Sequence, residues 1–227
     1  MEANIATLVG KTIPVIEGIN TLEEFIVHTA RVSNPSNQLN NETAPNLIRY
    51  LLKNQHFSPF EMASMTIKIN TTRDIARQIL RHRSFSFQEF STRYAVVDSK
   101  NIVLREARLQ DSKNRQNSFE TNNIELQEWF DFAQAITAKE AFELYNTAIE
   151  KGIAKEQARA LLPEGITPST LYMSGTIRSW ITYIILREKN GTQKEHKKIA
   201  LACKEILKQE LPNVHEALTN TNNEWML

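Results

Sequence analysis

The segment from Arg81 to Tyr94, RHRSFSFQEFSTRY, concentrates the residues of this chain that could bind an anion. Its guanidinium groups keep their charge and present planar forks of donors that match phosphate. Aromatic residues are interleaved with them at four positions: Phe85, Phe87, Phe90 and Tyr94. Cations beside aromatic rings favour an anion that itself carries flat rings, so the segment predicts a nucleotide site.

The positive charge is local to this part of the chain. From Arg73 to Arg93 the sequence has five arginines against Asp74 and Glu89, whereas the whole chain of 227 residues has a formal net charge of +1. A solvated helix end is the usual explanation of a single Arg-x-Arg pair. It does not explain why the cations gather in one segment, so we favour a binding site.

Composition argues against several other classes of protein. The six glycines form neither a GxGxxG turn nor a P-loop, so a Rossmann-type dinucleotide site is not predicted. The five histidines lack the paired spacing of metal ligands, and we expect no metal. There is no apolar run of about 20 residues for a membrane span, and no secretory signal. A near-neutral charge also argues against a protein that coats nucleic acid.

The single cysteine, Cys203, lies in IALACKEILK, where apolar residues recur at helical spacing. We interpret it as a small core residue rather than a nucleophile. One cysteine allows no intrachain disulfide, which suits a reducing compartment. We therefore expect the protein in the cytoplasm, or in the host cytoplasm if its source is a virus.

Hydrophobic periodicity predicts the elements that hold these residues. A capping box at Thr21 and Glu24 opens a helix. Alternating apolar residues predict strands over Met65–Asn70 and Thr167–Ser174. Further helices are predicted over Ala44–Asn54, Thr71–His82, Leu126–Lys151, Lys155–Leu162, Thr176–Lys189 and Gln193–Glu210. Together they predict one α+β domain over residues 1–227, with a polar surface loop at about 106–123 and a loose tail at about 219–227.

The pattern Arg-His-Arg, seven residues, Ser resembles the signature of the flavin-dependent thymidylate synthases. Several ordered blocks at matching spacing are far more specific than one motif. The resemblance runs from about residue 29 to residue 210. The matching blocks are His56–Glu61 (HFSPFE), Ala76–Gln78, the signature at Arg81, His82, Arg83 and Ser91, Ala158–Arg159 with the Leu161–Pro163 that follows, and Arg178–Arg187.

This resemblance implies a fold and a reaction. The family fold is a single α+β domain with a mixed or antiparallel sheet packed by helices. The family methylates dUMP at C5 with 5,10-methylenetetrahydrofolate as the carbon donor, reduced FAD as the hydride source and NADPH as the reductant of the flavin. Its products are dTMP and tetrahydrofolate. The resemblance also implies a homotetramer whose sites draw on several subunits, with neither nucleic acid nor membrane as a partner.

The resemblance also nominates site residues. His56 is expected beside the flavin, where the folate or nicotinamide ring stacks, although a lone histidine is more often structural. For dUMP the candidates are Gln78, Arg81, Glu89, Ser91, Thr92, Arg93, Arg159 and Arg187. For FAD they are Ser58, Arg81, His82, Arg83, Glu89, Thr176, Arg178 and Thr182.

Arg187 is the expected catalytic residue by the same resemblance. C5 of uracil is a poor nucleophile, and a chain without a suitable cysteine needs another way to activate it. A fixed guanidinium beside N3 and a ring carbonyl would stabilise the charge that develops there. The plainer alternative is an arginine that interacts with the helix dipole. Ser91 has no visible His–acid pair to activate it, so it is assigned to nucleotide binding.

Three positions depart from the better-known bacterial members. Thr176 and Thr182 stand where those members carry Asn, and Gly191 stands where they carry His. Threonine keeps a hydroxyl but loses an amide that both donates and accepts. Gln193 or His196 could offset the missing side chain at position 191.

Rival functions remain open at this point. A related flavin enzyme could modify C5 of UMP or make a hydroxymethyl product. A single-stranded RNA-binding module would also use arginines and aromatics. Steep loss of affinity with salt and absence of flavin would mark the RNA binder. An inactive structural paralogue is the least favoured alternative, because every charged position of the signature is present.

Overall fold

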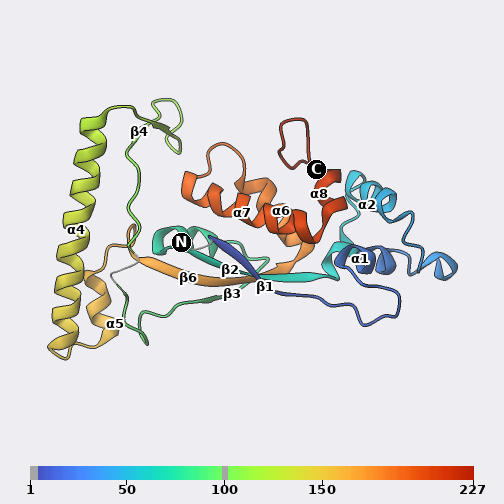
Figure 1. Cartoon of the computed structure of the whole chain (residues 1–227), viewed down its shortest axis with the longest axis horizontal. Coiled ribbons are helices and arrows are strands. Elements are labelled where there is room, and N and C mark those ends of the chain that lie inside the picture. The colour runs from blue at the N-terminus through green and yellow to red at the C-terminus, as the bar shows by residue number, and fades with distance from the viewer. Residues whose placement is uncertain (1–4, 99–101) are drawn as a thin grey trace.

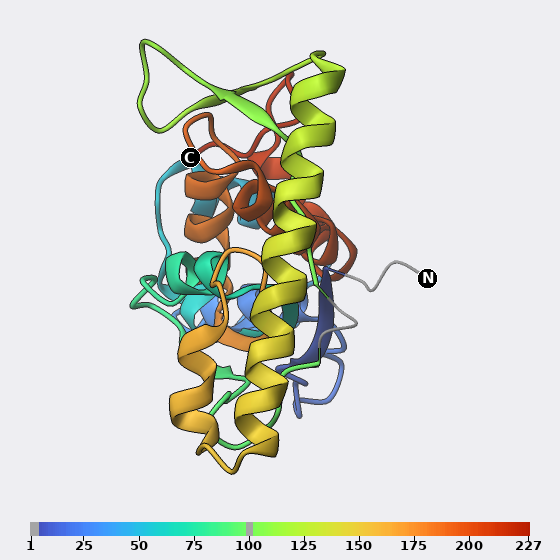
Figure 2. The same ribbon diagram turned by 90° about the vertical axis from the view of Figure 1, so that its left-hand side faces the viewer.

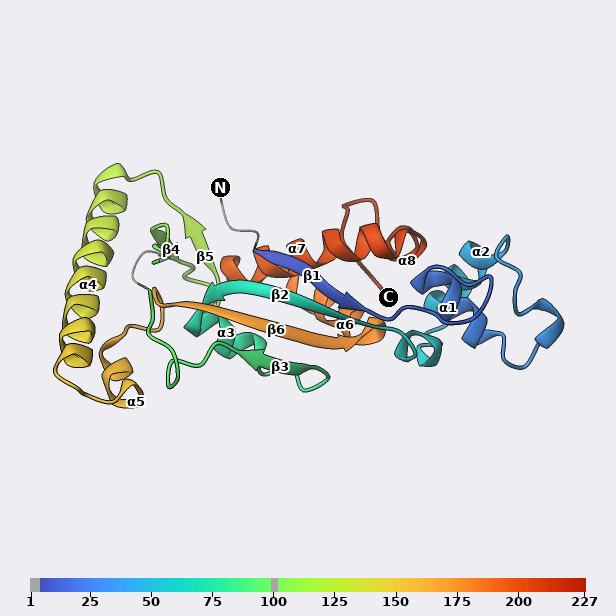
Figure 3. The ribbon, with the colours of Figure 1, turned by 60° about the horizontal axis from the view of Figure 1, so that its bottom comes forward.

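A four-stranded antiparallel sheet forms the centre of the protein. The computed structural model describes residues 5–98 and 102–227. The strand order is β1-β2-β6-β3, so β6 lies between β2 and β3, and Figure 3 shows the four side by side. The strands are β1 (Ala6–Lys11), β2 (Ser64–Thr72), β6 (Pro168–Thr176) and β3 (Ser86–Glu89). All three pairings are antiparallel, which confirms the α+β fold and makes the sheet antiparallel rather than mixed.

Helices cover one face of the sheet and flank both of its ends. On the face lie α3 (Arg73–Ile79), α6 (Ile177–Arg187) and α7 (Lys194–Glu210). Figure 1 shows one flanking group at the end of the sheet where α6 begins: α1 (Leu22–Ala30), α2 (Ala44–Lys53) and α8 (Pro212–Leu218). The opposite end carries α4 (Ile124–Glu150) and α5 (Lys155–Ala158). Short 3₁₀ turns complete the frame at Pro35–Asn37, Ser58–Glu61 and Arg159–Leu161.

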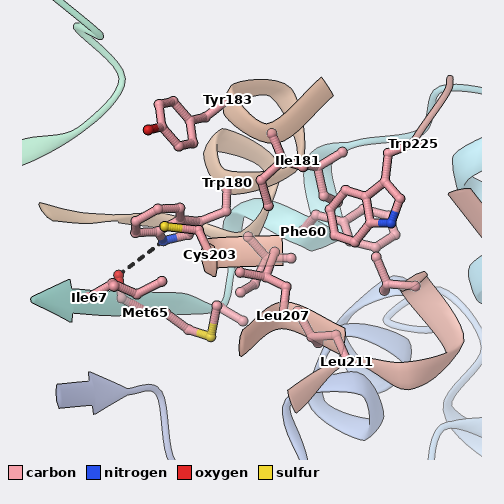
Figure 4. Close-up of a cluster of buried hydrophobic side chains, with 14 of the residues drawn as sticks. Phe60, Met65, Ile67, Trp180, Ile181, Tyr183, Cys203, Leu207, Leu211 and Trp225 are labelled. Carbon is pink, nitrogen blue, oxygen red and sulfur yellow. Dashed lines mark hydrogen bonds between the residues drawn. The ribbon is translucent and has the colours of Figure 1, made fainter. Parts of the chain in front are cut away.

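The main core lies between the sheet and the helices α6 and α7. Alternation along β2 buries Met65, Ile67 and Ile69, as predicted. Trp180 is fully buried against them, and its indole N–H donates to the carbonyl of Met65 at 3.2 Å (Figure 4). Cys203 lies beside this tryptophan with none of its surface exposed, and burial raises the pKa of its thiol to about 12. The prediction of a core cysteine is confirmed.

Helix boundaries follow the sequence signals to within a few residues. The capping box is present, because the Thr21 side chain accepts from the backbone of Glu24 while the Glu24 carboxylate accepts from the backbone of Thr21. The helix predicted to reach His82 ends at Ile79 and continues as a turn. Thr72 occupies its N-cap position, but its hydroxyl donates to Asp74 instead of capping the backbone.

The segment predicted as a polar loop at 106–123 instead forms a β-hairpin, so that prediction is wrong. Its strands are β4 (Arg108–Gln110) and β5 (Ser118–Glu120), seen in Figure 2 beside the start of α4. The Asp111 carboxylate accepts from the backbone of Lys113 and Asn114 in the turn, and these hydrogen bonds lower the pKa of Asp111. Three-residue strands rich in polar residues carry no clear alternation, which is why the pattern was missed.

The C-terminal tail, predicted to be loose, is held by a tryptophan. Trp225 is 1% exposed, and its indole N–H donates to Nδ1 of His215 at 3.1 Å. Its backbone forms a β-bridge with Thr219. The preceding Pro212 does not end the helical region but occupies the first turn of α8, where its missing N–H costs nothing. The buried tryptophan corrects the expectation of a loose tail, whereas α7 ends at Glu210 as predicted.

Gly175 is a position where a side chain has no room. A Cβ built there would lie 2.4 Å from Cδ1 of Phe85. The Phe85 ring in turn packs against Trp180, with the two ring centroids 4.8 Å apart. Gly175→Ala is therefore expected to lower the free energy of unfolding by about 1–3 kcal/mol, the usual cost of overpacking a core. Urea unfolding of the variant measures this. Gly165→Ala, at a site with open space around the added Cβ, is the matched control.

Candidate nucleotide and flavin site

The Arg-His-Arg signature occupies the turn between α3 and β3. Its histidine points to the end of α6, where Nε of Arg187 donates to Nε2 of His82 at 2.9 Å. The signature and the expected catalytic arginine, which are 105 residues apart in the sequence, therefore meet in one place. No carboxylate pairs with Arg187 in the part of the chain that the structure describes. Its charge is thus available for an anionic or electron-rich ligand.

His82 is held in its neutral form at this contact. Burial and the adjacent Arg187 charge lower its pKa to about 4. Because Nε2 accepts from Arg187, the single ring proton of neutral His82 must be on Nδ1. The ring also meets Tyr183 edge to face, with centroids 4.9 Å apart. His82 therefore orients the arginine without adding a second charge.

Because His82 and His196 are neutral in the folded protein, we expect its stability to depend on pH. His196, fully buried nearby, has its pKa lowered to about 3 by burial and by the charges of Arg187 and His82. Between pH 6.5 and about 4 the unfolded chain binds protons at these two rings and the folded chain does not. The contribution of the two neutral histidines to the free energy of unfolding is therefore fully present above pH 6.5. It is lost as the pH drops towards 4. Thermal unfolding midpoints across this range measure the effect, and a His196→Gln variant is expected to show a shallower fall.

Arg81 and Arg83 flank His82 and both are exposed. Within residues 5–98 and 102–227 neither has an ion-pair partner. Two uncompensated guanidiniums two residues apart repel each other, and an anion with several charged oxygens would relieve that repulsion. These residues therefore suit a phosphate-bearing ligand.

A second group of candidates lies where β6 begins. Thr92 is buried, and Nη1 of Arg159 donates to its hydroxyl at 3.3 Å. Arg93 pairs with Glu156 at 3.1 Å, on the edge of a cavity of about 480 Å³. Ser91 is half-buried, and its carbonyl accepts from the backbone of the turn that follows. Two arginines, Arg93 and Arg159, beside the edge of a cavity are suited to binding a phosphate group.

Glu89 belongs to this region through β3. Its carboxylate accepts from the hydroxyl of Ser169 on β6 at 2.8 Å. A glutamate within an arginine-rich segment would ordinarily be expected to form a salt bridge with one of those arginines. In the described residues Glu89 forms no ion pair with an arginine, and its side chain contacts Ser169 instead.

A third group lies at the opposite end of β6, around the turn Ser58–Glu61. Glu61 accepts from the Thr176 hydroxyl and from Nη1 of Arg178, both at 2.8 Å. The Arg178 guanidinium also lies 5.2 Å from the ring centre of Phe57. His56 and Ser58, on either side of Phe57, are exposed, and the ring of His56 meets Tyr50 edge to face at 5.8 Å.

The three departures from the bacterial pattern have local explanations. Thr176 caps α6 by accepting from the backbone of Ser179, and Thr182 donates to the carbonyl of Arg178. Gly191 has φ +90°, a conformation that disfavours any side chain. His196 is fully buried, so it does not replace an exposed side chain at position 191.

Within one chain the candidate residues form separate groups. The group with Thr92 and Arg159 lies near the start of β6, because Glu89, shortly before Thr92, pairs with Leu171. The group with Thr176 and Arg178 lies at the other end, since Thr176 is the last residue of β6. Eight residue steps of extended strand separate these ends by about 26 Å. His82, Arg187 and Gln78, the group described first, lie on the face covered by helices. One chain does not gather all the predicted residues around one ligand.

Several residues of the site were not predicted in the roles that the structure gives them. Glu61 was noticed only as part of a block, yet it holds two of the flavin candidates. Tyr183 and His196 contact the signature histidine through their rings. His196 follows the apolar spacing of Ile199 and Cys203 on α7, so a polar residue on an apolar stripe was the available signal.

No group of three or more metal-binding side chains occurs in the described ranges. Among the helices of those ranges, none has the length and apolar character needed to cross a bilayer.

Comparison with known proteins places the chain in a family. The family model described as "Thymidylate synthase complementing protein" matches residues 15–213. The chain is 54% identical over 213 residues to a probable flavin-dependent thymidylate synthase of Paramecium bursaria Chlorella virus 1, covering 94% of this chain and 98% of the relative. It is 47% identical to the flavin-dependent thymidylate synthase of a Synechocystis strain, covering 86% and 89%.

A solved structure supports the same placement. The crystal structure of the UMP/dUMP methylase PolB from Streptomyces cacaoi bound with 5-Br dUMP matches with a TM-score of 0.76 at 26% identity, over 94% of this chain and 93% of that chain. Three findings point to the same family: the fold, the signature at the turn after α3, and the similarity over nearly the whole length of the chain. The chain is an enzyme of the thymidylate synthase complementing protein family, the flavin-dependent thymidylate synthases.

Proposed function

We propose that this protein converts dUMP to dTMP, taking the methylene carbon from methylenetetrahydrofolate and reducing equivalents from NADPH through FAD. The observation that carries the proposal is the contact between Arg187 and His82, which joins the signature to the expected catalytic arginine. The viral and cyanobacterial relatives support it through their names, and the Streptomyces methylase supports a uridine nucleotide as substrate.

The proposed dUMP site uses Arg187 to activate the base. Its guanidinium, oriented by neutral His82, would face N3 and a ring carbonyl and stabilise the negative charge that makes C5 nucleophilic. Arg93 and Arg159 would bind the phosphate. The remaining proposed contacts are Gln78, Arg81, Glu89, Ser91 and Thr92.

The residues present fit a flavin dinucleotide. Arg81 and Arg83 are exposed cations suited to its phosphates, and Glu61 keeps Thr176 and Arg178 in place at the N-terminus of α6. The remaining proposed FAD contacts are Ser58, His82, Glu89 and Thr182. When bound, FAD would supply the hydride that NADPH provides. His56, exposed beside this group, would stack on the folate or nicotinamide ring.

The proposed assembly is a homotetramer with shared sites. The separation of the predicted groups along β6 supports it, because a second chain would be needed to complete one site. The long helix α4 adds support, since it buries Ala138, Phe142 and Tyr145 on one face. The opposite face exposes an apolar stripe for another subunit: Trp129, Phe132, Ile136 and Leu144. Analytical ultracentrifugation of the wild type and of Phe132→Asp measures the state, and a wild-type monomer would contradict the proposal.

The proposed reaction is tested by measuring dTMP while each component is omitted in turn. The expected result is dTMP only when dUMP, methylenetetrahydrofolate, NADPH and FAD are all present. UMP is added as a parallel substrate, because the Streptomyces relative is described as a UMP/dUMP methylase. Methylation of UMP with no reaction of dUMP would replace the proposed substrate, and product without NADPH or FAD would refute the flavin-dependent reaction.

Cys203→Ser is expected to retain turnover. The thiol is fully buried and its pKa is about 12, so almost none is thiolate at neutral pH. A serine in this core costs stability but removes no reacting group. Steady-state kcat of the variant, measured well below its unfolding temperature, is the check. Complete loss of turnover in a folded variant would show that the cysteine takes part in the reaction.

A further inference from the structure

A chain of hydrogen bonds runs from the core to the start of α7 through Gln78. The Tyr183 hydroxyl lies 3.1 Å from Nε2 of His196, and Nδ1 of His196 lies 3.3 Å from Oε1 of Gln78. Nε2 of Gln78 donates to Oε1 of Gln193 at 2.7 Å, and Nε2 of Gln193 donates to Glu195 at 2.9 Å. Four of these five residues have no role in the proposed chemistry.

The direction of every bond in this chain is fixed from one end. A carboxylate only accepts, so Gln193 must turn its amide nitrogen towards Glu195 and its oxygen towards Gln78. Gln78 must then donate to Gln193 and present its oxygen to His196. His196 therefore donates from Nδ1, and the Tyr183 hydroxyl donates to Nε2. Burial favours the neutral His196 that this pattern requires.

The carboxylate at the end of the chain is itself held firmly. Arg108 of β4 donates to both of its oxygens, at 2.7 and 2.9 Å, and Nη1 of Arg105 lies 3.5 Å away. Burial acts to raise the pKa of Glu195, but the hydrogen bonds from Arg108 and Gln193 bring it below its ordinary value. Glu195 is thus a carboxylate of fixed charge and position, and the hairpin segment supplies the arginine that fixes it.

We propose that Gln193, directed by the Arg108-anchored carboxylate of Glu195, is a positioning residue that fixes the amide of Gln78 in one of its two orientations for nucleotide binding. The proposal rests on the dUMP-binding role proposed above for Gln78. With the chain intact, Gln78 offers a ligand one remaining N–H and one remaining lone pair, at known places. Without it the amide can rotate by half a turn, which exchanges donor and acceptor.

The test compares Gln193→Met with Lys194→Met in the flavin-loaded enzyme. Methionine at position 193 matches the length of glutamine but makes no strong hydrogen bond. Lys194 is the next residue and pairs with Glu106 and Glu120, outside the chain of hydrogen bonds, so its variant reports on loosening of the hairpin alone. Gln193→Met is expected to raise the dissociation constant and the KM for dUMP about tenfold, the effect of one misdirected hydrogen bond. Its kcat at saturating dUMP and its flavin content should stay near the wild-type values.

Glu195→Gln provides the conservative variant. It keeps an oxygen that can accept from Gln193, so dUMP affinity should stay closer to the wild type than in Gln193→Met. Equal affinity for dUMP in Gln193→Met and the wild type would overturn the proposal. So would equal losses in Gln193→Met and Lys194→Met, which would assign the effect to the hairpin. A wild-type enzyme that binds flavin but no dUMP would instead reject the proposed function, and the wild-type measurement separates that outcome from the others.

Discussion

Replacement of Arg187 by alanine is expected to lower kcat for dTMP formation by about 10²–10³-fold, the usual effect of removing one preorganised electrostatic contact to the developing charge. Arg187 has no carboxylate partner in the described residues, and its Nε is held by His82. Its removal therefore takes away the charge proposed to activate C5. The candidates for flavin binding on the other side of α6, Arg178 and Thr182, are untouched, so FAD should stay bound.

Two variants give this experiment its control. Arg187→Lys keeps the charge but loses the planar fork, so it should recover only part of the activity. Lys189→Ala removes an exposed cation two residues later and should leave kcat unchanged. Turnover is followed as dTMP, and flavin retention as the visible absorption after gel filtration. Near-wild-type turnover in Arg187→Ala would contradict the proposed role of this residue.

Lys204→Met is expected to give the largest loss of stability, about 3–5 kcal/mol in the free energy of unfolding, because it leaves a buried carboxylate unpaired. The Lys204 ammonium lies 2.7 Å from the Glu188 carboxylate, and the two side chains are only 4% and 3% exposed. The same ammonium donates to the carbonyl of Asn223, and Glu188 accepts from the backbone of Trp225. This pair therefore ties the end of α6 and the C-terminal tail to α7.

The double variant Glu188→Leu/Lys204→Met separates the pair from its surroundings. Removing both charges should recover part of the lost stability, since the unpaired charge is the main cost. Lys208→Met, one helical turn further along α7, removes an exposed lysine and should change stability by less than about 1 kcal/mol. Urea unfolding of all three variants measures the differences. An Lys204→Met variant as stable as Lys208→Met would show that the buried pair contributes little.

Elements with strong periodicity could be predicted from the sequence. The helix with Trp180 and Ile184 and the strand with Met65 and Ile67 each bury one apolar face, and both are present where the pattern placed them. The edge strands β1 and β3 were not predicted. They are short, and their residue types do not alternate clearly. In β1 the exposed Val9 follows the half-buried Leu8, and β3 contains a single apolar residue, Phe87.

The tail and the hairpin were mispredicted for a different reason. Trp225 is buried because Glu188, 37 positions away, and His215, 10 positions away, accept hydrogen bonds from its backbone and indole N–H. The hairpin at 108–120 is held by ion pairs between Arg108 and Glu195 and between Lys194 and Glu120. Such contacts between separate elements leave no local pattern in a polar segment. The composition of the tail and of the hairpin therefore predicted loop rather than ordered structure.

The site was predicted residue by residue only through the family resemblance. Spacing could show that Arg187 and Arg178 lie on different sides of one helix, but not that Arg187 meets His82. Nor could it show that Thr176 and Arg178 share Glu61, because that contact joins residues more than a hundred positions apart. The separation of the groups along β6 likewise comes from the topology of the sheet.

The most direct test of the proposed reaction is a single turnover of the flavin-loaded enzyme without oxygen. The protein is first bleached with NADPH, excess NADPH is removed, and dUMP and methylenetetrahydrofolate are added separately and then together. Recovery of the visible flavin band, with a matching amount of dTMP, only when both are present is the predicted result. A band that stays bleached with both substrates present, or that recovers without dTMP, would contradict reductive methylation of dUMP by this protein.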